Sequence, residues 1–148
     1  MDSKVALITG SGGGIGFGIG TRLMEEKFVV VFNDLSDSLK DDKLEIVDGL
    51  AGKHETSFMY VKADISSGEG HERILSLLKN ETGRIDVLVN NAGIAPRNRR
   101  DLLEMERDDF KALMSVNLEG PFFLTQKVAN FMLDLKTVSY THLTLPTN

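Results

Sequence analysis

The sequence predicts an α/β fold of three layers, in which helices cover both faces of a doubly wound parallel β-sheet. Short apolar runs rich in β-branched residues alternate with longer segments whose apolar residues have helical spacing. Strands that are joined through helices run parallel. The apolar runs are also continuous, which is typical of strands buried on both faces.

The elements follow in order along the chain. Four apolar runs predict strands at residues 5–8, 29–32, 58–61 and 85–89. Apolar residues at helical spacing predict intervening helices at 15–27, within the charged segment 36–53, and at 72–82. No internal repeat and no linker interrupts this order, so we predict one domain.

The composition excludes several classes of function. With 148 residues, 41% of them apolar, a net charge of −5 and no cysteine, the chain has no disulfide framework, thiolate zinc site or cysteine nucleophile. The mild acidity argues against nucleic acid as the partner. No apolar run approaches the roughly 20 residues of a membrane span, and the N-terminus shows no signal sequence. We therefore expect a cytoplasmic protein without a membrane partner.

The three histidines, His54, His71 and His142, lack partners at the spacing of metal ligands. We therefore predict no metal site, and we expect all three side chains at the surface.

A glycine-rich loop, TGSGGGIG at 9–16, leads from the first strand into the first helix. A helix N-terminus offers unpaired N–H groups, and glycines let a pyrophosphate approach the backbone. We expect Gly10 to make the turn, Gly14 the close approach and Gly16 the tight packing of helix on strand. The alternatives are a merely flexible turn, or the GxGxG of nucleoside-binding methyltransferases, which Gly12, Gly14 and Gly16 match.

Asp34 ends the second strand, about 20 residues beyond the loop. A carboxylate there is placed to accept hydrogen bonds from an adenosine ribose. It would repel a 2′-phosphate by roughly 4 kcal/mol before screening, at about 4 Å and an effective dielectric of about 20. NAD is therefore preferred over NADP. The alternative is a turn aspartate that caps the next helix.

A second motif, NNAG at 90–93, closes the fourth strand. Together with TGxxxGIG at 9–16 it resembles the short-chain dehydrogenase/reductase family. The segments ADI at 63–65 and SVNLEG at 115–120, which opens a long helix, resemble it as well, and the likeness runs from about residue 4 to 133. It implies a Rossmann-type fold, here truncated after the fourth strand and its following helices.

The resemblance implies cofactor-binding roles for residues of four segments, namely Gly10, Ser11, Gly14, Ile15, Gly16, Asp34, Leu35, Asp64, Ile65, Asn91, Ala92 and Gly93. Among them, Asp34 would bind the adenosine ribose, Asp64 the adenine amine, and 91–93 would support the nicotinamide ribose. Asp64 could also share the cap of the next helix with Ser66 and Ser67.

Asn117 matches the family's catalytic asparagine, whose backbone carbonyl holds a water in a proton relay at a break in the helix. The alternative is an asparagine that caps this helix. The family's catalytic serine has no match, and neither has its tyrosine followed four residues later by lysine. Tyr60 and Tyr140 both lack that lysine. In the family that lysine lies beside the tyrosine, and a nearby cation favours the phenolate form of a tyrosine. Because these residues have no match, the active site is incomplete in this chain.

We therefore interpret the chain as the cofactor-binding part of an oxidoreductase. In the full-length parent it would transfer a hydride between NAD(P)(H) and a small carbonyl or secondary alcohol, with 3-oxoacyl or sugar-like substrates suggested by analogy. The parent is expected to be a homo-oligomer, a dimer or tetramer. The alternatives are a catalytically inactive nucleotide-binding fragment and a methyltransferase that uses S-adenosylmethionine.

The last twelve residues, 137–148, have no charge and no periodicity. Residues 138–147 match, without a mismatch, the translation of a transposase-type sequencing adapter. We therefore predict that 1–136 form a partial NAD(P)-binding Rossmann domain and that 137–148 are a non-native tail. A genuine disordered tail is the alternative.

Overall fold

The computed structural model describes residues 3–96 and 101–135. The predicted tail, with Tyr140 and His142, lies outside them. Within the described residues a four-stranded sheet is formed by β1 (Val5–Ile8), β2 (Val29–Asp34), β3 (Phe58–Lys62) and β4 (Val87–Val89). Its order is β3-β2-β1-β4 and its pairings are parallel. The predicted parallel sheet is therefore confirmed, with β4 at one edge.

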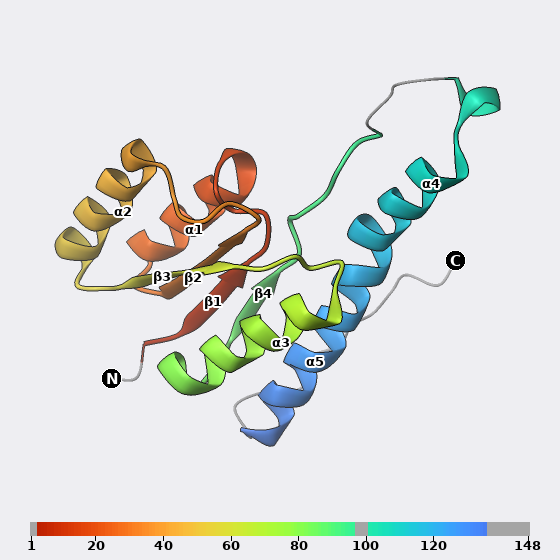
Figure 1. Cartoon of the computed structure of the whole chain (residues 1–148). Coiled ribbons are helices and arrows are strands. Elements are labelled where there is room, and N and C mark those ends of the chain that lie inside the picture. Colours follow the sequence, from red (N-terminus) through yellow and green to blue (C-terminus); the bar gives the residue numbers. More distant parts are fainter. Residues whose placement is uncertain (1–2, 97–100, 136–148) are drawn as a thin grey trace, which may run out of the picture.

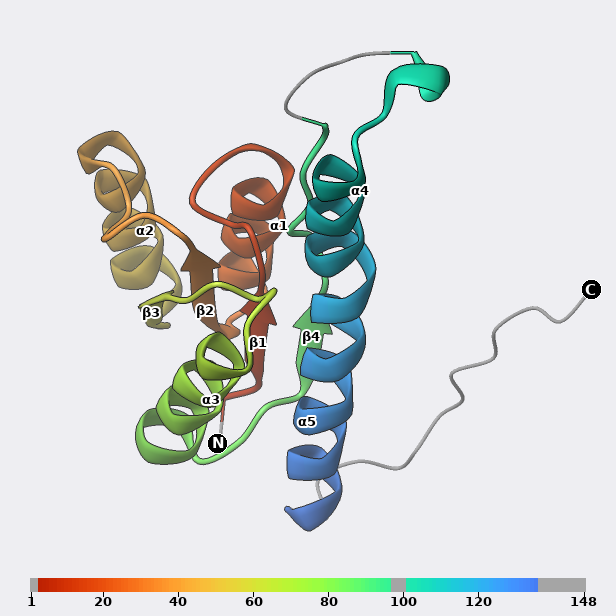
Figure 2. The same ribbon diagram turned by 45° about the vertical axis from the view of Figure 1, so that its right-hand side comes forward.

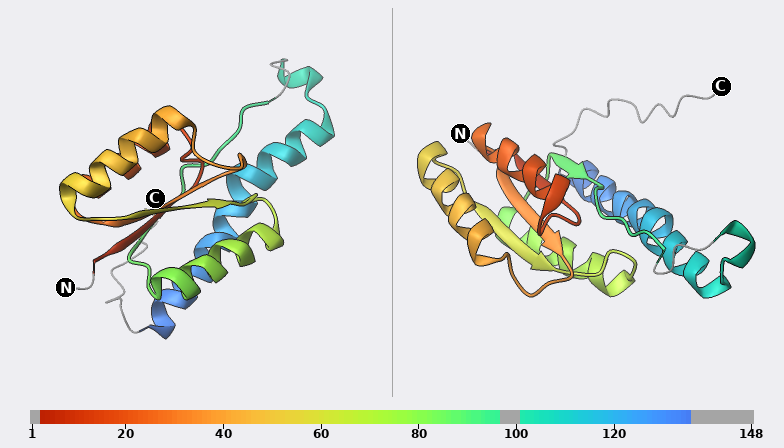
Figure 3. Two further views of the ribbon diagram at one scale, coloured as in Figure 1. Left: turned by 60° about the vertical axis from the view of Figure 1, so that its left-hand side comes forward. Right: turned by 90° about the horizontal axis from the view of Figure 1, so that it is seen from above.

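Helices cover both faces of this sheet. Helices α1 (Gly14–Glu25) and α2 (Asp41–His54) lie on one face, and α3 (Gly68–Leu77) and α5 (Gly120–Asp134) lie on the other (Figures 1 and 3). A π-helical turn, Leu78–Thr82, extends α3. The doubly wound α/β prediction is confirmed. No helix among the described residues is both long enough and apolar enough to cross a bilayer.

The central strand β1 contributes to two separate cores. Val5 and Leu7 pack against α3 and α5, whereas Ala6 and Ile8 pack with Phe32 beneath α1 and α2. Because successive side chains of a strand point to opposite faces, a strand covered on both sides must be apolar throughout. This explains the continuous apolar runs of the sequence.

The segment 115–120 was predicted to open a long helix; it leads directly into α5, but the helical rod begins earlier than predicted. Helix α4 (Arg107–Met114) precedes it, residues 115–119 form a π-helical turn, and α5 follows in the same rod (Figure 2). The acidic first turn of α4 favours a helix start by the helix dipole. Pro121 lies in the first turn of α5, where its missing N–H is tolerated.

Asp86 fixes the entry into β4 to the start of β1. Its Oδ2 accepts a hydrogen bond from the backbone N–H of Val5 at 2.8 Å. Arg84 donates to Oδ2 from Nε at 3.0 Å and to Oδ1 from Nη2 at 2.6 Å. Burial works against the charged carboxylate, but the Arg84 and Val5 hydrogen bonds outweigh it and hold the pKa of Asp86 below its usual range.

Asp86→Asn is expected to lower the free energy of unfolding at pH 7 by about 1–3 kcal/mol. A lowered folded-state pKa means that the stabilisation is present above the unfolded pKa of about 3.9 and is lost as pH falls through the folded pKa. The difference from the parent chain should therefore shrink as the pH is lowered below about 4, as measured by urea unfolding. Asp134→Asn, an exposed change at the end of α5, is the control; a pH-independent difference at Asp86 would contradict this account.

Candidate functional site

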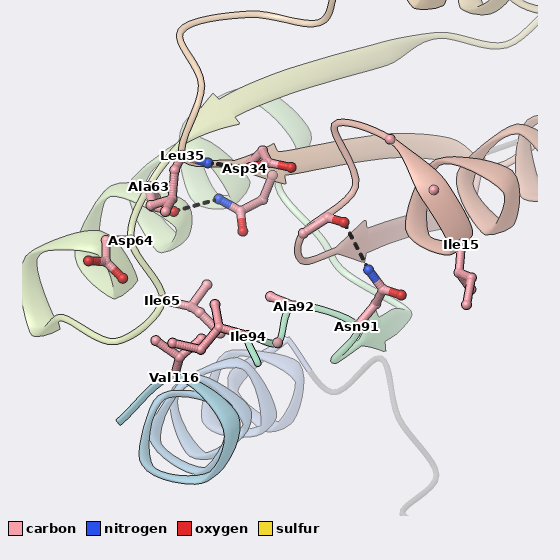
Figure 4. A pocket seen from close by; sticks show the side chains of 15 residues that line it. Ile15, Asp34, Leu35, Ala63, Asp64, Ile65, Asn91, Ala92, Ile94 and Val116 are labelled. Atoms are coloured by element: carbon pink, nitrogen blue, oxygen red, sulfur yellow. Dashed lines mark hydrogen bonds between the residues drawn. The ribbon is translucent and has the colours of Figure 1, made fainter. Parts of the chain in front are cut away.

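A cavity of about 420 Å³ opens at the carboxyl ends of the strands (Figure 4). Ligands of open α/β sheets bind at this edge. Ten of the twelve predicted cofactor-binding residues line the cavity, namely Gly10, Gly14, Ile15, Asp34, Leu35, Asp64, Ile65, Asn91, Ala92 and Gly93. Four segments far apart in the chain therefore meet around one space. Ser11 and Gly16 lie outside this lining.

The glycine loop is shaped by what its glycines touch. Gly10 has φ +61°, and a Cβ there would lie 2.7 Å from the Cα of Ala92. Gly14 has φ +55° and its missing side chain faces open space, as a close ligand approach requires. A Cβ on Gly16 would lie 2.8 Å from the carbonyl oxygen of Gly10 and would collide with the Asn91 amide. Gly10 thus makes a turn that only glycine adopts easily, and Gly16 packs tightly on the loop and on Asn91, rather than on a strand.

Ser11 is buried behind the loop. Its hydroxyl donates to the carbonyl of Ile8 at 2.7 Å and accepts from the backbone N–H of Asn33 at 3.0 Å. The side chain therefore fixes the loop to β1 and β2.

Thr9 joins the loop to the end of β4. Its buried hydroxyl accepts hydrogen bonds from the backbone N–H groups of Asn91 and Ala92, both at 3.1 Å. The Asn91 amide donates in return to the carbonyl of Thr9 at 2.9 Å. It also donates to the carbonyl of Gly10 at 2.9 Å (Figure 4). The glycine-rich loop and the NNAG motif thus hold each other in place through these four hydrogen bonds. Thr9 begins the TGxxxGIG motif, but the motif alone predicted no role for it.

Asp34 is held by the glycine loop. Its Oδ2 accepts from the N–H of Gly12 at 2.9 Å and its Oδ1 accepts from the N–H of Leu35 at 2.7 Å. Helix α2 begins at Asp41 with Lys40 as its N-cap, so Asp34 does not cap that helix. Each carboxylate oxygen can accept more than one hydrogen bond, and Asp34 lines the cavity. The group therefore fits the hydroxyls of a ribose.

Asn33 is a site residue that the sequence analysis missed. Its side chain is 1% exposed, and its amide donates to the carbonyls of Val61 and Ala63 at 3.1 and 3.0 Å. Its backbone carbonyl accepts from the N–H of Ser11 at 2.8 Å. It joins the loop, β2 and the end of β3. Its position was the only sequence feature that pointed to a role: Asn33 is a polar residue at the end of an apolar run and next to Asp34.

The turn after β3 carries Asp64 and Ile65 into the cavity lining. Asp64 Oδ1 accepts from the N–H and hydroxyl of Ser66 at 2.9 and 2.7 Å. The N-cap of α3 is Ser67, whose hydroxyl accepts from the N–H of Gly70 at 3.0 Å. The shared cap suggested for Asp64 is therefore carried by Ser67, while Asp64 shapes the turn.

Asn117 lies in the π-helical turn and binds the chain that leaves β4. Its Oδ1 accepts from the N–H of Ile94 at 2.8 Å, and its Nδ2 donates to the carbonyl of Ile94 at 2.9 Å. It therefore does not cap a helix. Pro121, four residues on, has no N–H for the α-helical bond to the Asn117 carbonyl. Asn117 thus lies where the helix departs from α-helical geometry, and its side chain holds the segment that follows β4.

Tyr60 is unsuited to acid–base catalysis. Burial raises its pKa above the ordinary value, and the hydrogen bond with Ser36 only partly offsets this effect. A general acid or base works best with a pKa near the working pH. Its hydroxyl donates to the carbonyl of Ser36 at 2.9 Å, away from the cavity lining. Among the described residues, no three histidine, cysteine, aspartate or glutamate side chains are grouped to hold a metal ion.

Fold and site together define an α/β protein with a cavity at the carboxyl ends of its parallel strands, lined in part by a glycine-rich loop. The family model described as short chain dehydrogenase matches residues 4–138. This chain therefore belongs to the short-chain dehydrogenase family, as its motifs predicted.

Individual relatives agree with this assignment. An uncharacterized oxidoreductase of Thermotoga maritima is 35% identical over 126 residues, which cover 85% of this chain and 47% of the relative. A 3-oxoacyl-acyl-carrier-protein reductase of the same organism is 33% identical, covering 90% and 52%. The crystal structure of such a reductase from Brucella melitensis in complex with NAD has a TM-score of 0.82 at 31% identity, covering 95% and 53%. The chain thus spans about half the length of the relatives it matches.

Proposed function

We propose that the cavity binds NAD(H) and that this chain is the cofactor-binding part of an oxidoreductase acting on a small carbonyl or secondary alcohol. The observation that carries this proposal is the convergence of ten predicted residues from four segments on one cavity. A bound nicotinamide would supply the hydride. The chain's own residues would bind and orient: the glycine loop receives the pyrophosphate, and Asp34 receives the adenosine ribose.

The preference for NAD over NADP is supported by Asp34. Its carboxylate lines the cavity and is held in place by the Gly12 and Leu35 N–H groups. A negative charge fixed beside the ribose disfavours a 2′-phosphate. Relatives of both kinds exist, since a metagenomic short-chain oxidoreductase crystallised with NADP has a TM-score of 0.76 at 28% identity, covering 90% of this chain and 58% of that one.

Titration of the purified chain with NADH and NADPH, followed by nicotinamide fluorescence, tests both parts of this proposal. We expect NADH to bind at least about tenfold more tightly, a difference of about 1.4 kcal/mol. Asp34→Asn should remove most of that preference by improving NADPH binding. S-adenosylmethionine should not displace NADH. If neither NADH nor NADPH bound, the proposed function would be overturned, and an unchanged ratio of the two affinities in the variant would overturn the role of Asp34.

We infer that the catalytic serine, tyrosine and lysine belong to the longer parent protein and that the chain as given binds cofactor without turnover. No tyrosine of the sequence is followed four residues later by lysine. The named relatives suggest 3-oxoacyl or sugar-like substrates. Sequencing of the source gene across the Lys136–Thr137 junction tests this inference, and also whether residues 1–136 are native and 137–148 an adapter. A native reading frame through residue 148 would contradict it.

A homo-oligomeric parent is part of the proposal. The rod of α4 and α5 exposes large apolar side chains, among them Phe110, Leu118 and Phe122. Apolar surface gathered on one element is typical of an interface between subunits. Sedimentation equilibrium of the full-length parent should show self-association that the Phe122→Glu substitution weakens. A parent that stays monomeric at all concentrations would contradict this part of the proposal.

A further inference from the structure

His71 is not at the surface, contrary to the sequence-based expectation. It lies on the face of α3 turned toward the sheet and is only 4% exposed. Ile74, on the same helix, and Ile65 belong to the apolar core on this side of the sheet. A buried imidazole in such surroundings requires a hydrogen-bond partner.

The partner of His71 is the turn that borders the cavity. Nε2 of the imidazole lies 2.6 Å from the carbonyl oxygen of Ile65. A carbonyl oxygen only accepts hydrogen bonds, so His71 is the donor and carries its proton on Nε2. The bond spans six residues of the chain, from α3 back to the end of the turn.

The same carbonyl is confined from other sides. Gly120 at the start of α5 packs so closely on it that a Cβ there would collide with the Ile65 oxygen. One residue earlier, Gly70 packs on the carbonyl of Asp64 with equally little space. The peptide units of Asp64 and Ile65 are therefore held by two helices, and His71 adds a side-chain hydrogen bond to the Ile65 carbonyl.

We propose that His71 is a positioning residue for the adenosine half of the cofactor. Asp64 and Ile65 line the cavity, whereas His71 does not, so it acts only through the turn (Figure 4). Without the imidazole donor, the buried carbonyl of Ile65 loses its partner, and the turn gains freedom to rotate away from the cavity. The inference rests on the proposed binding of a dinucleotide.

Three variants separate the hydrogen bond from the volume of the side chain. His71→Gln places an amide nitrogen the same number of bonds from Cα as Nε2 and retains the donor. His71→Asn keeps the amide but places its nitrogen one bond short. His71→Leu retains apolar volume and removes the donor.

The readouts are the affinities for AMP and NADH, the melting temperature, and amide hydrogen exchange in the turn. We expect His71→Leu and His71→Asn to weaken AMP binding about tenfold, as the loss of one hydrogen bond would. The His71→Gln variant should keep nearly the affinity of the unsubstituted chain. The N–H of Ser67 donates to the Asp64 carbonyl at 3.1 Å. Its hydrogen should exchange faster in the His71→Leu and His71→Asn variants than in His71→Gln.

A role in packing alone would move the melting temperature but leave AMP affinity unchanged, and that result would overturn the inference. Equal weakening of AMP binding in His71→Gln and His71→Leu would overturn the inference as well. If the unsubstituted 148-residue chain binds no nucleotide, the proposed function fails, and the role of His71 as a positioning residue for the cofactor fails with it. Unaltered exchange at Ser67 in all variants would then show that the bond does not hold the turn either.

Discussion

Gly16→Ala is expected to weaken NADH binding by about 100-fold or more, equivalent to about 2.7 kcal/mol. The added Cβ would lie 2.8 Å from the carbonyl oxygen of Gly10 and 3.0 Å from the Cα of Ser11. These are backbone atoms, so the loop itself must move, and with it the surface offered to the pyrophosphate. Isothermal titration with NADH measures the loss, and urea unfolding should show a cost of about 1–3 kcal/mol from overpacking.

Gly18→Ala provides a matched control on the same helix. Gly18 is exposed, and apart from its chain neighbours and the backbone of its own helix no atom lies within 4 Å of the position its Cβ would take. Alanine in a compatible helical position stabilises a protein by about 0.4–1 kcal/mol. We expect this variant to melt higher and to bind NADH like the parent chain. Similar losses in both variants would show that a methyl group anywhere on this turn of α1, and not the contact of Gly16 with the loop, is responsible.

Asn33→Asp is expected to destabilise the fold by about 3–5 kcal/mol at pH 7. The change is nearly isosteric, but it turns a carboxylate oxygen toward the carbonyls of Val61 and Ala63, which now receive two N–H donors. A buried carboxylate without a partner has a raised pKa. The penalty should therefore relax as the pH falls and the acid becomes neutral.

Asn90→Asp is the control for this prediction. Asn90 is exposed, and its amide donates to the hydroxyl of Thr125 at 2.8 Å, a group that can donate to a carboxylate instead. We expect a change within about 0.5 kcal/mol. Urea unfolding at several pH values compares the two variants, and equal effects would show that charge alone, without burial, accounts for the result at Asn33.

Much of the site was predictable because its signals are local. The glycine loop, Asp34 and the asparagine pair at the end of β4 each follow a strand, and strand ends in a parallel sheet meet at one edge. That rule brings ten of the predicted residues to one cavity without knowledge of any contact. The start of the rod at α4 was missed because its first residues are mostly charged and exposed.

The class of fold and the residues around the cavity could be predicted from the sequence, because periodicity and strand-end motifs involve residues that are neighbours in the chain. Which side chains hold those residues in place became evident only in the folded chain. Thr9 bonds residues 82 and 83 positions away, and Asn33 bonds Val61 at a separation of 28. Such partners depend on how strands and helices register after folding. For the same reason His71, polar and without a sequence motif, was assigned to the surface although its partner lies in the core.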